Sequence, residues 1–138
     1  MVSKFRAARI SERIREELSD LLIKQVNDPR LTGVSITDVE VDRELAFANI
    51  YFSAIEGSER AAEIKDGFQH AQGFLRAELS HRINLRVFPR LRFHWDPTFE
   101  RAERIEQLFT ELHQQEESAN QAFPTQNDDN AGDENAAE

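Results

Sequence analysis

The stretch His70-Ala71-Gln72-Gly73-Phe74-Leu75-Arg76 lies inside a long run with helical periodicity, from about Glu59 to Ile83. A glycine inside a helix costs about 1 kcal/mol relative to alanine. The run is therefore either one long helix that tolerates Gly73 or two helices that meet at an angle. Because a strand is predicted on each side of the run, we expect the break, with Ala71 and Gly73 at the elbow. Apolar residues recur on one helical face on each side of it: Ala61, Ile64, Phe68 and Ala71 before, then Leu75, Leu79 and Ile83 after.

The segment after this run, residues 86–95, alternates as a strand and is rich in arginine. Pro89 lacks a backbone donor, which favours a strand start or an edge position. The planar guanidinium group suits phosphates and base edges. We therefore predict nucleic-acid contact here, and the alternative is a solvated sheet face. Between residues 76 and 92, a single acid, Glu78, accompanies five arginines: Arg76, Arg82, Arg86, Arg90 and Arg92.

Two strands are predicted before the helical run. Residues 34–41 alternate, but the parity changes at Thr37-Asp38, which predicts a bulge. Residues 45–54 form the clearest strand. The face that carries Ala48 and Ile50 is small and apolar, and it is suited to a helix packed closely on it. The opposite face, with Phe47 and Tyr51, is partly aromatic, so either another element covers it or it stacks bases.

Residues 4–26 predict an amphipathic helix that Asp28-Pro29 ends. Cations at a helix N-terminus oppose the macrodipole, typically by about 0.3–1 kcal/mol each when exposed. An external phosphate would relieve this conflict, and the alternative is an ordinary solvated face. Cations crowd the first half of this helix: Lys4, Arg6, Arg9, Arg13 and Arg15.

The net charge of −9 is unevenly distributed. Residues 1–100 carry 15 Lys+Arg and 16 Asp+Glu, whereas residues 101–138 carry 2 and 10. The first hundred residues can therefore hold a basic face, although the whole chain is acidic. Residues 98 to about 115 predict a final helix, and the polar, acidic residues that follow predict disorder. We expect one domain over residues 1–115 and a disordered acidic tail over residues 116–138.

Composition excludes several classes of protein. A chain of 138 residues suits a single domain with a modest core. The absence of cysteine excludes disulfides, a thiol nucleophile and a cysteine zinc site. No run approaches the roughly 20 apolar residues that span a membrane, and no signal-peptide pattern follows the charged start. We expect a cytoplasmic protein without a membrane partner.

The predicted elements follow the order helix, strand, strand, helix, helix, strand, helix. The first two strands pair as a hairpin. The two helices then cross over and return the third strand parallel to the second. This order predicts an α+β fold, with a three-stranded mixed sheet, helices on one face, and residues 45–54 as the middle strand.

Four stretches together resemble the bacterial ribosome-binding factor A family, whose members have a type II KH-like domain of order α-β-β-α-α-β. In ordinary KH domains a GxxG loop between the helices brings backbone close to nucleotides. The family replaces it with an Ala-x-Gly interhelical kink, here Ala71-Gln72-Gly73, so we expect side-chain contacts to phosphates. The matching stretches span roughly residues 4–112: Asp28-Pro29-Arg30-Leu31, Ala48-Asn49-Ile50-Tyr51-Phe52-Ser53, His70-Ala71-Gln72-Gly73-Phe74-Leu75-Arg76, and Leu85-Arg86 followed by Pro89-Arg90-Leu91-Arg92-Phe93.

The resemblance implies binding to immature or free 30S subunits through 16S ribosomal RNA. It also implies a role in late small-subunit maturation and 16S 5′-end processing, and a link to growth in the cold. We expect a non-catalytic monomer with no cofactor, no metal and no DNA partner. The predicted RNA-binding residues form two groups: Lys4, Arg6, Arg9 and Arg13 in the first helix, and Arg76, Arg82, Arg86, Arg90 and Arg92 later in the chain.

Two other functions compete with this interpretation. An enzyme would need ligands or bases such as the four histidines (His70, His81, His94 and His113), but they form no HxH, HExxH, P-loop or serine-elbow pattern. A protein-interaction module would use the exposed sheet edge or the acidic tail. Deleting residues 116–138 discriminates between this module and an RNA-binding domain.

Overall fold

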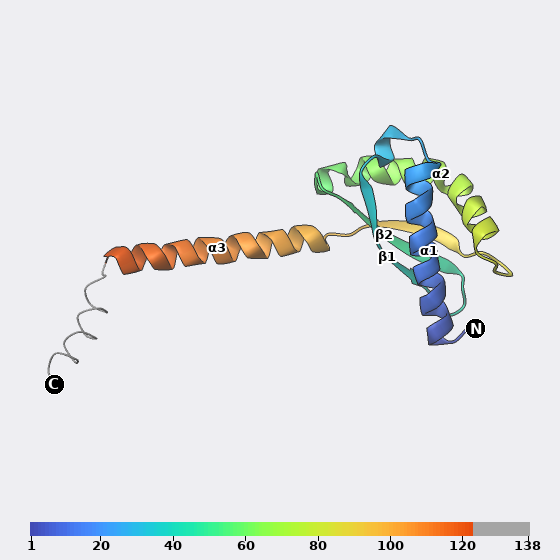
Figure 1. Ribbon diagram of the computed structural model, residues 1–138, viewed down its shortest axis with the longest axis horizontal. Helices are drawn as coiled ribbons and strands as arrows, with labels where there is room; N and C mark the ends of the chain where they lie inside the picture. The colour runs from blue at the N-terminus through green and yellow to red at the C-terminus, as the bar shows by residue number, and fades with distance from the viewer. Residues whose placement is uncertain (123–138) are drawn as a thin grey trace. The chain divides into compact units, whose positions relative to one another are not determined.

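The computed structural model describes residues 1–122 and confirms an α+β fold (Figure 1). The chain divides into two compact units, Met1–Phe99 and Glu100–Glu138, whereas we expected the final helix within one domain. The elements are α1 (Lys4–Lys24), the 3-10 helix η1 (Pro29–Leu31), β1 (Val34–Val41), β2 (Phe47–Ala54), the 3-10 helix η2 (Ser58–Arg60), α2 (Ala61–Arg82), β3 (Arg90–Trp95) and α3 (Thr98–Ala122).

The sheet has the predicted topology. Its strand order is β1-β2-β3, with β1 antiparallel and β3 parallel to the central β2. The register shifts between Ile36 and Asp38, where the change of parity predicted a bulge. Because α2 carries the chain from β2 back to the start of β3, the parallel pair is a crossover connection of the kind that the sequence predicted.

Both helices of Met1–Phe99 pack on one face of the sheet, and Figure 1 shows α1 lying across the strands. Every second residue of β2 is buried there, from Ala48 to Ala54. The ring of Phe68 in α2 stacks on that of Phe93 in β3, with centroids 4.3 Å apart. The other face carries half-buried residues of β2 and exposed residues of β3. It is called the open face below.

The hairpin turn is longer than the sequence indicated, so β2 begins at Phe47 rather than at residue 45. The Asp42 carboxylate accepts hydrogen bonds from the N–H groups of Ala46 and Phe47, each at 2.9 Å. Leu45 adopts a φ of 58°, a left-handed conformation that bulky residues rarely take. These contacts form a turn where alternation alone predicted strand.

The prediction of two separate helices around Gly73 is wrong, because α2 is one α-helix from Ala61 to Arg82. Figure 1 shows this helix changing direction where its colour passes from green to yellow-green, so an angle is present within a continuous helix. The cost of a glycine, about 1 kcal/mol, is smaller than the gain from burying side chains on both sides, such as Phe68 and Leu75. The helix therefore continues through Gly73.

The glycine that permits close packing is Gly67 rather than Gly73. A Cβ atom at Gly67 would lie 2.9 Å from Leu31 Cδ2 and 3.1 Å from Arg30 Cβ, in η1. A Cβ atom at Gly73 would meet nothing within 4 Å. The segment Asp28 to Leu31, which we interpreted only as a helix stop, is thus also the surface on which α2 packs.

Strand β3 begins at Arg90, four residues later than expected. The carbonyls of Phe88 and Pro89 accept hydrogen bonds from the Arg76 guanidinium, and Pro89 has no N–H to donate. Residues 83–89 therefore form a loop that joins α2 to β3.

In the second unit, α3 continues to Ala122. We expected the helix to end near residue 115, so the disorder predicted for residues 116–122 is wrong. Glutamate, glutamine and alanine are good helix formers, and a low content of large apolar residues does not prevent a helix. The rest of the predicted tail, residues 123–138, lies outside the described residues.

Candidate nucleic-acid interface

Three arginines lie along one flank of α1. Arg6, Arg9 and Arg13 follow the spacing i, i+3, i+7, and all three are exposed. The first turn contains no acidic residue, so the conflict between cations and the helix dipole is present as predicted. Lys4 lies apart from this flank and lines a shallow hollow toward β1 with Asp38, among others.

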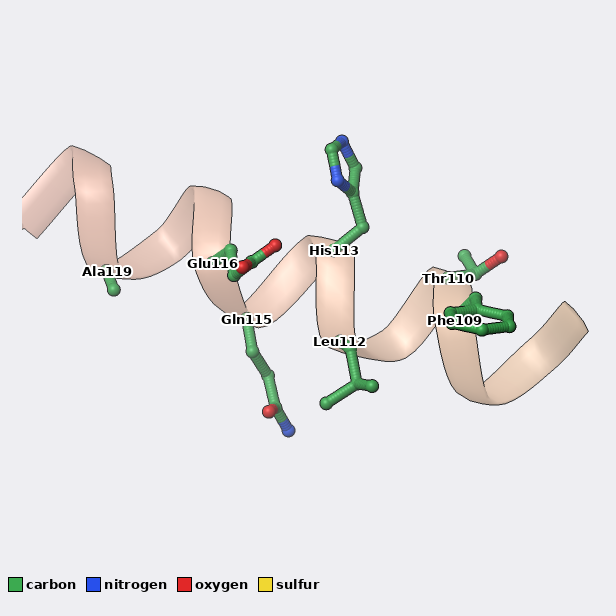
Figure 2. A pocket seen from close by; sticks show the side chains of 7 residues that line it. All are labelled: Phe109, Thr110, Leu112, His113, Gln115, Glu116 and Ala119. Carbon is green, nitrogen blue, oxygen red and sulfur yellow. The ribbon is translucent and has the colours of Figure 1, made fainter. Parts of the chain in front are cut away.

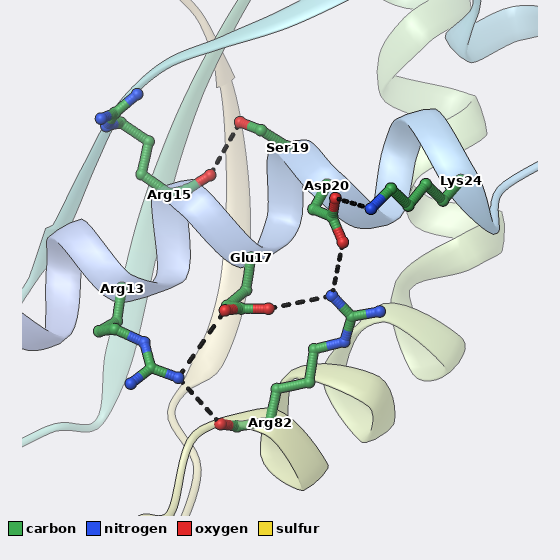
Figure 3. Close-up of polar contacts among 7 residues, drawn as sticks. All are labelled: Arg13, Arg15, Glu17, Ser19, Asp20, Lys24 and Arg82. Carbon is green, nitrogen blue, oxygen red and sulfur yellow. Dashed lines mark hydrogen bonds and ion pairs between the residues drawn. The ribbon is translucent and has the colours of Figure 1, made fainter.

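Arg82 of α2 is held by two carboxylates of α1 (Figure 3). Its Nη1 atom lies 2.9 Å from Glu17 Oε1 and 3.0 Å from Asp20 Oδ2. Hydrogen bonds from Arg82 and then Lys24 lower the pKa of Asp20, and the same contact with Asp20 raises the pKa of Arg82. This charge joins α1 to α2 and is already compensated inside the protein.

Arg76 is also used internally. It donates a hydrogen bond from Nε to the Pro89 carbonyl at 3.2 Å and another from Nη2 to the Phe88 carbonyl. Gln72 donates to the Leu91 carbonyl at 3.0 Å, one turn earlier in α2. These side chains fix the loop over residues 83–89 and the start of β3.

The remaining arginines of this region point outward. Arg86 lies exposed in the loop over residues 83–89, and Arg90 and Arg92 are exposed on the open face. The guanidinium carbon of Arg92 lies 3.5 Å from the centroid of the Phe47 ring. Among the described residues, Arg86 and Arg90 have no ion pair, so their charges are available to an external anion.

Backbone contacts bring these cations to one end of Met1–Phe99. The N–H of Val2 donates to the Arg43 carbonyl at 2.8 Å, which holds the start of α1 beside the hairpin turn. The N–H of Arg90 donates to the Ala46 carbonyl at 2.9 Å, which holds the start of β3 beside the same turn. Figure 1 shows the N-terminus, this turn and the loop before β3 on the same side of the molecule.

A third contact connects the α1 flank to the loop. Arg13 Nη2 donates to the Arg82 carbonyl at 3.0 Å and lies 3.8 Å from Glu17 Oε2 (Figure 3). Arg13 is therefore beside the residue from which the loop carrying Arg86 leaves α2. Of the second predicted group, Arg86 is therefore in a loop that begins beside the α1 flank.

Sequence reasoning missed Arg43 as a member of the group. It lies exposed in the hairpin turn, and its Nε atom donates to the Val2 carbonyl at 3.0 Å. A cation in a turn between two predicted strands was the available signal. What could not be foreseen is that the start of α1 lies beside this turn.

The histidines do not gather into a metal site within the part of the chain that the structure describes. The described residues contain no cluster of three His, Cys, Asp or Glu side chains suited to a metal, and none of their buried residues is polar or charged. His94 Nε2 lies 2.9 Å from Asn49 Oδ1, which accounts for one of the four histidines. Within the same range, no helix combines the length and apolar character needed to cross a membrane.

One surface hollow lies along α3 (Figure 2). All of its lining residues, from Phe109 to Ala119, belong to this single helix, so the hollow is open rather than enclosed. It offers no group of convergent polar side chains of the kind that binds a small ligand.

Comparison with known proteins adds to this geometry. The family model described as ribosome-binding factor A matches residues 6–109. Ribosome-binding factor A of Thiobacillus denitrificans is 42% identical over 103 residues, which cover 75% of this chain and 83% of the relative. That of Syntrophobacter fumaroxidans is 40% identical over 115 residues, covering 80% and 97%.

Solved structures share the fold. The solution NMR structure of a Thermotoga maritima protein assigned to the same family matches with a TM-score of 0.58 and 28% identity, over 68% of this chain and 90% of that one. The crystal structure of ribosome-binding factor A from Thermus thermophilus matches with a TM-score of 0.56 and 24% identity, over 64% and 93%.

Proposed function

The chain belongs to the ribosome-binding factor A family, and from this premise we propose that it is a non-catalytic factor that binds the small ribosomal subunit. In this proposal it associates in the cytoplasm, as a monomer, with immature or free 30S subunits through 16S ribosomal RNA. It assists late maturation, including processing of the 16S 5′ end, and it supports growth at low temperature.

The observation that carries the proposal is the convergence of exposed cations at one end of Met1–Phe99. Their sources are α1, the hairpin turn, the loop over residues 83–89 and β3. Arg76 and Arg82 are left out because they are half-buried and have internal partners. Arg13 and Arg43 also have internal contacts, but their side chains stay exposed. The proposed contact surface, called the basic surface here, consists of Lys4, Arg6, Arg9, Arg13, Arg43, Arg86, Arg90 and Arg92.

Recognition in this proposal depends on side chains. Because α2 runs unbroken through Gly73, no loop is available between two helices to bring backbone N–H groups close to a nucleotide. Arginine and lysine side chains instead neutralise phosphates and release condensed counterions. Such binding positions the protein on folded RNA without base-specific chemistry.

Binding alone is sufficient for a role in assembly. A protein that binds one RNA conformation more tightly than another shifts the population toward it, by no more than the difference in affinity. We infer that this chain stabilises one conformation of maturing small-subunit RNA until a later step displaces it. No bond is made or broken by the protein in this mechanism.

The test is co-sedimentation of purified protein with small subunits, together with crosslinking to their RNA. The double variant Arg9→Glu/Arg86→Glu reverses two charges of the basic surface, and we expect about tenfold weaker association, equivalent to about 1.4 kcal/mol. Lys65→Glu is the matched control, because Lys65 is exposed in the first half of α2, outside the basic surface.

Equal affinity of the double variant and the wild type would overturn the basic surface. Metal-dependent cleavage of precursor RNA by the purified protein would overturn the non-catalytic role.

A further inference from the structure

The open face carries rings and cations together along β2 and β3. Phe47, Asn49 and Tyr51 are half-buried in β2, and Arg90 and Arg92 are exposed in β3. Both helices of Met1–Phe99 lie on the other face. The parallel register sets three pairs side by side: Phe47 with Arg90, Asn49 with Arg92, and Tyr51 with His94.

Two flat stacking groups result from this register. The guanidinium carbon of Arg92 lies 3.5 Å above the centre of the Phe47 ring, a cation–π contact. The rings of Tyr51 and His94 have centroids 5.3 Å apart and planes inclined by 31°. Unpaired bases stack both on aromatic rings and on arginine planes.

The spacing suits successive nucleotides rather than a single small ligand. Phe47 and Tyr51 are four residues apart in β2, about 13 Å at roughly 3.3 Å per residue. Asn49 lies between them, with its Oδ1 atom 2.9 Å from His94 Nε2. A base placed between the two stacking groups would therefore lie beside the Asn49 amide, whose NH2 group can donate to a base edge.

Charge confines a nucleic acid to one half of this face. Register places Asp38 of β1 opposite Tyr51 and Glu40 opposite Asn49, and both acids are exposed. Phosphates are repelled from this β1 side and attracted to Arg90 and Arg92 on the β3 side. Because paired bases do not present their flat faces, the occupant with matching chemistry is a single strand.

We propose that the β2–β3 half of the open face binds single-stranded RNA through its bases. One base stacks on the Arg92–Phe47 pair, another stacks on the Tyr51–His94 pair, and the phosphates lie along Arg90. This inference rests on the proposed function, and it extends that function from phosphate contacts to the recognition of unpaired nucleotides.

The experiment compares three short probes of equal length with the full chain at one fixed salt concentration. The probes are a single-stranded oligoadenylate, an abasic oligomer with the same number of phosphates, and an RNA duplex. One stacked base accounts for roughly a tenfold gain in affinity. We therefore expect the oligoadenylate to bind at least tenfold more tightly than the abasic oligomer or the duplex, with NMR shift changes at Phe47, Tyr51 and His94.

Variants separate stacking from charge. Phe47→Leu and Tyr51→Leu keep an apolar side chain but remove the aromatic ring. Arg92→Lys keeps the charge but removes the planar guanidinium group. Each variant removes one of the two stacking groups and is expected to reduce the preference for the oligoadenylate over the abasic oligomer about tenfold. Contacts to phosphates are common to both probes and cancel in this ratio. Phe74→Leu is the control, because Phe74 is an exposed aromatic residue of α2, 47% accessible, and the variant should keep the preference. If an aromatic variant does not fold, Arg92→Lys carries the same test at an exposed position.

Equal affinity for the oligoadenylate and the abasic oligomer would overturn this inference. The inference would also be overturned if Phe74→Leu lost as much of the preference for the oligoadenylate as the variants of the open face. The outcome is separable from the proposed function. Salt-sensitive subunit binding without any base preference would overturn only the stacking surface, whereas an intact base preference without subunit binding would overturn only the assembly role.

Discussion

Gly67 packs against η1 so closely that a methyl group has no room. The added Cβ atom would lie 2.9 Å from a Leu31 methyl carbon and 3.1 Å from Arg30 Cβ, and Leu31 is itself buried. Gly73, six residues later in the same helix, faces open space. The two glycines therefore provide a matched pair in one helix.

We expect Gly73→Ala to raise the free energy of unfolding by about 1 kcal/mol, because alanine favours the helix. Gly67→Ala has the same helical gain but overpacks the contact with Leu31, at a cost of about 1–3 kcal/mol. Denaturant unfolding should show Gly67→Ala less stable than Gly73→Ala by that amount. Equal stability of the two variants would contradict the packing described here.

The contact between Asp28 and Arg30 should make the stability of the fold depend on pH. Hydrogen bonds from the side chain and then the backbone N–H of Arg30 lower the pKa of Asp28 from 3.8 to about 2. A lowered pKa means that its contribution to stability is present above about pH 4 and is lost as the pH falls toward 2. Asp28→Asn should be less stable than the wild type at pH 7, and the difference should shrink between pH 4 and pH 2.

Urea unfolding at a series of pH values measures this difference. The pKa values of Asp20 and Asp42 are also lowered, but these residues are common to both proteins and cancel in the comparison. A difference between wild type and variant that stays constant from pH 7 to pH 2 would contradict the assigned ion pair.

At the scale of single residues, the sequence identified the arginines but not their partners. Arg82 and Arg86 look alike in sequence, since both belong to the same positive stretch. In the fold, Arg82 meets two carboxylates that lie more than 60 positions away, Glu17 and Asp20, whereas Arg86 is exposed in a loop. Such long-range pairing depends on how α1 packs on α2, and no local pattern contains it.

Arg82 links α2 to α1 through its ion pairs with Glu17 and Asp20. In the variant Arg82→Gln, Glu17 and Asp20 would lose their shared cation and repel each other. We expect a lower free energy of unfolding together with a raised pKa of Asp20, followed by NMR titration. Thermal unfolding of Arg82→Gln and wild type at pH 7 gives the direct comparison.

The matched control is Arg9→Gln in α1. Arg9 is exposed and has no ion pair among residues 1–122, so its removal should change stability by less than about 0.5 kcal/mol. It should weaken subunit binding, whereas Arg82→Gln should affect binding only as far as it disturbs the fold. A loss of stability in Arg9→Gln, or a loss of subunit binding in Arg82→Gln without a loss of stability, would contradict the division between internal and exposed arginines.

Among the elements, those with strong periodicity were predictable. Alternation located β1 within its observed bounds, and the change of parity located its bulge. The predicted bounds were wrong where side chains that are distant in the sequence determine the local structure. Asp42 delays the start of β2 and Arg76 delays the start of β3, while burial on both sides carries α2 through Gly73.

For the whole molecule, charge is separated along the chain. Residues 116–138 contain seven acidic residues and no lysine or arginine, so their deletion changes the net charge from −9 to −2. If the basic surface is the contact with ribosomal RNA, the deletion variant should retain subunit association and bind somewhat more tightly at low salt. Quantitative co-sedimentation measures this, and loss of association would identify these residues as the main contact.

The fold could be predicted at this scale because family resemblance and topology rules agreed on a three-stranded mixed sheet. The convergence of cations could not, because it depends on tertiary contacts such as that between Val2 and Arg43. The open face was visible in the sequence only as an alternation of rings and arginines, and the register of β2 with β3 was needed to pair them.

The most direct test of the account is the salt dependence of small-subunit binding. For the wild type, the logarithm of the association constant should fall steeply and linearly with the logarithm of salt concentration. For Arg9→Glu/Arg86→Glu the slope should be shallower by about 1.4–1.8, the loss of two phosphate contacts, whereas Lys65→Glu should keep the wild-type slope. A wild-type affinity that does not change with salt would contradict the basic surface as the site of RNA binding.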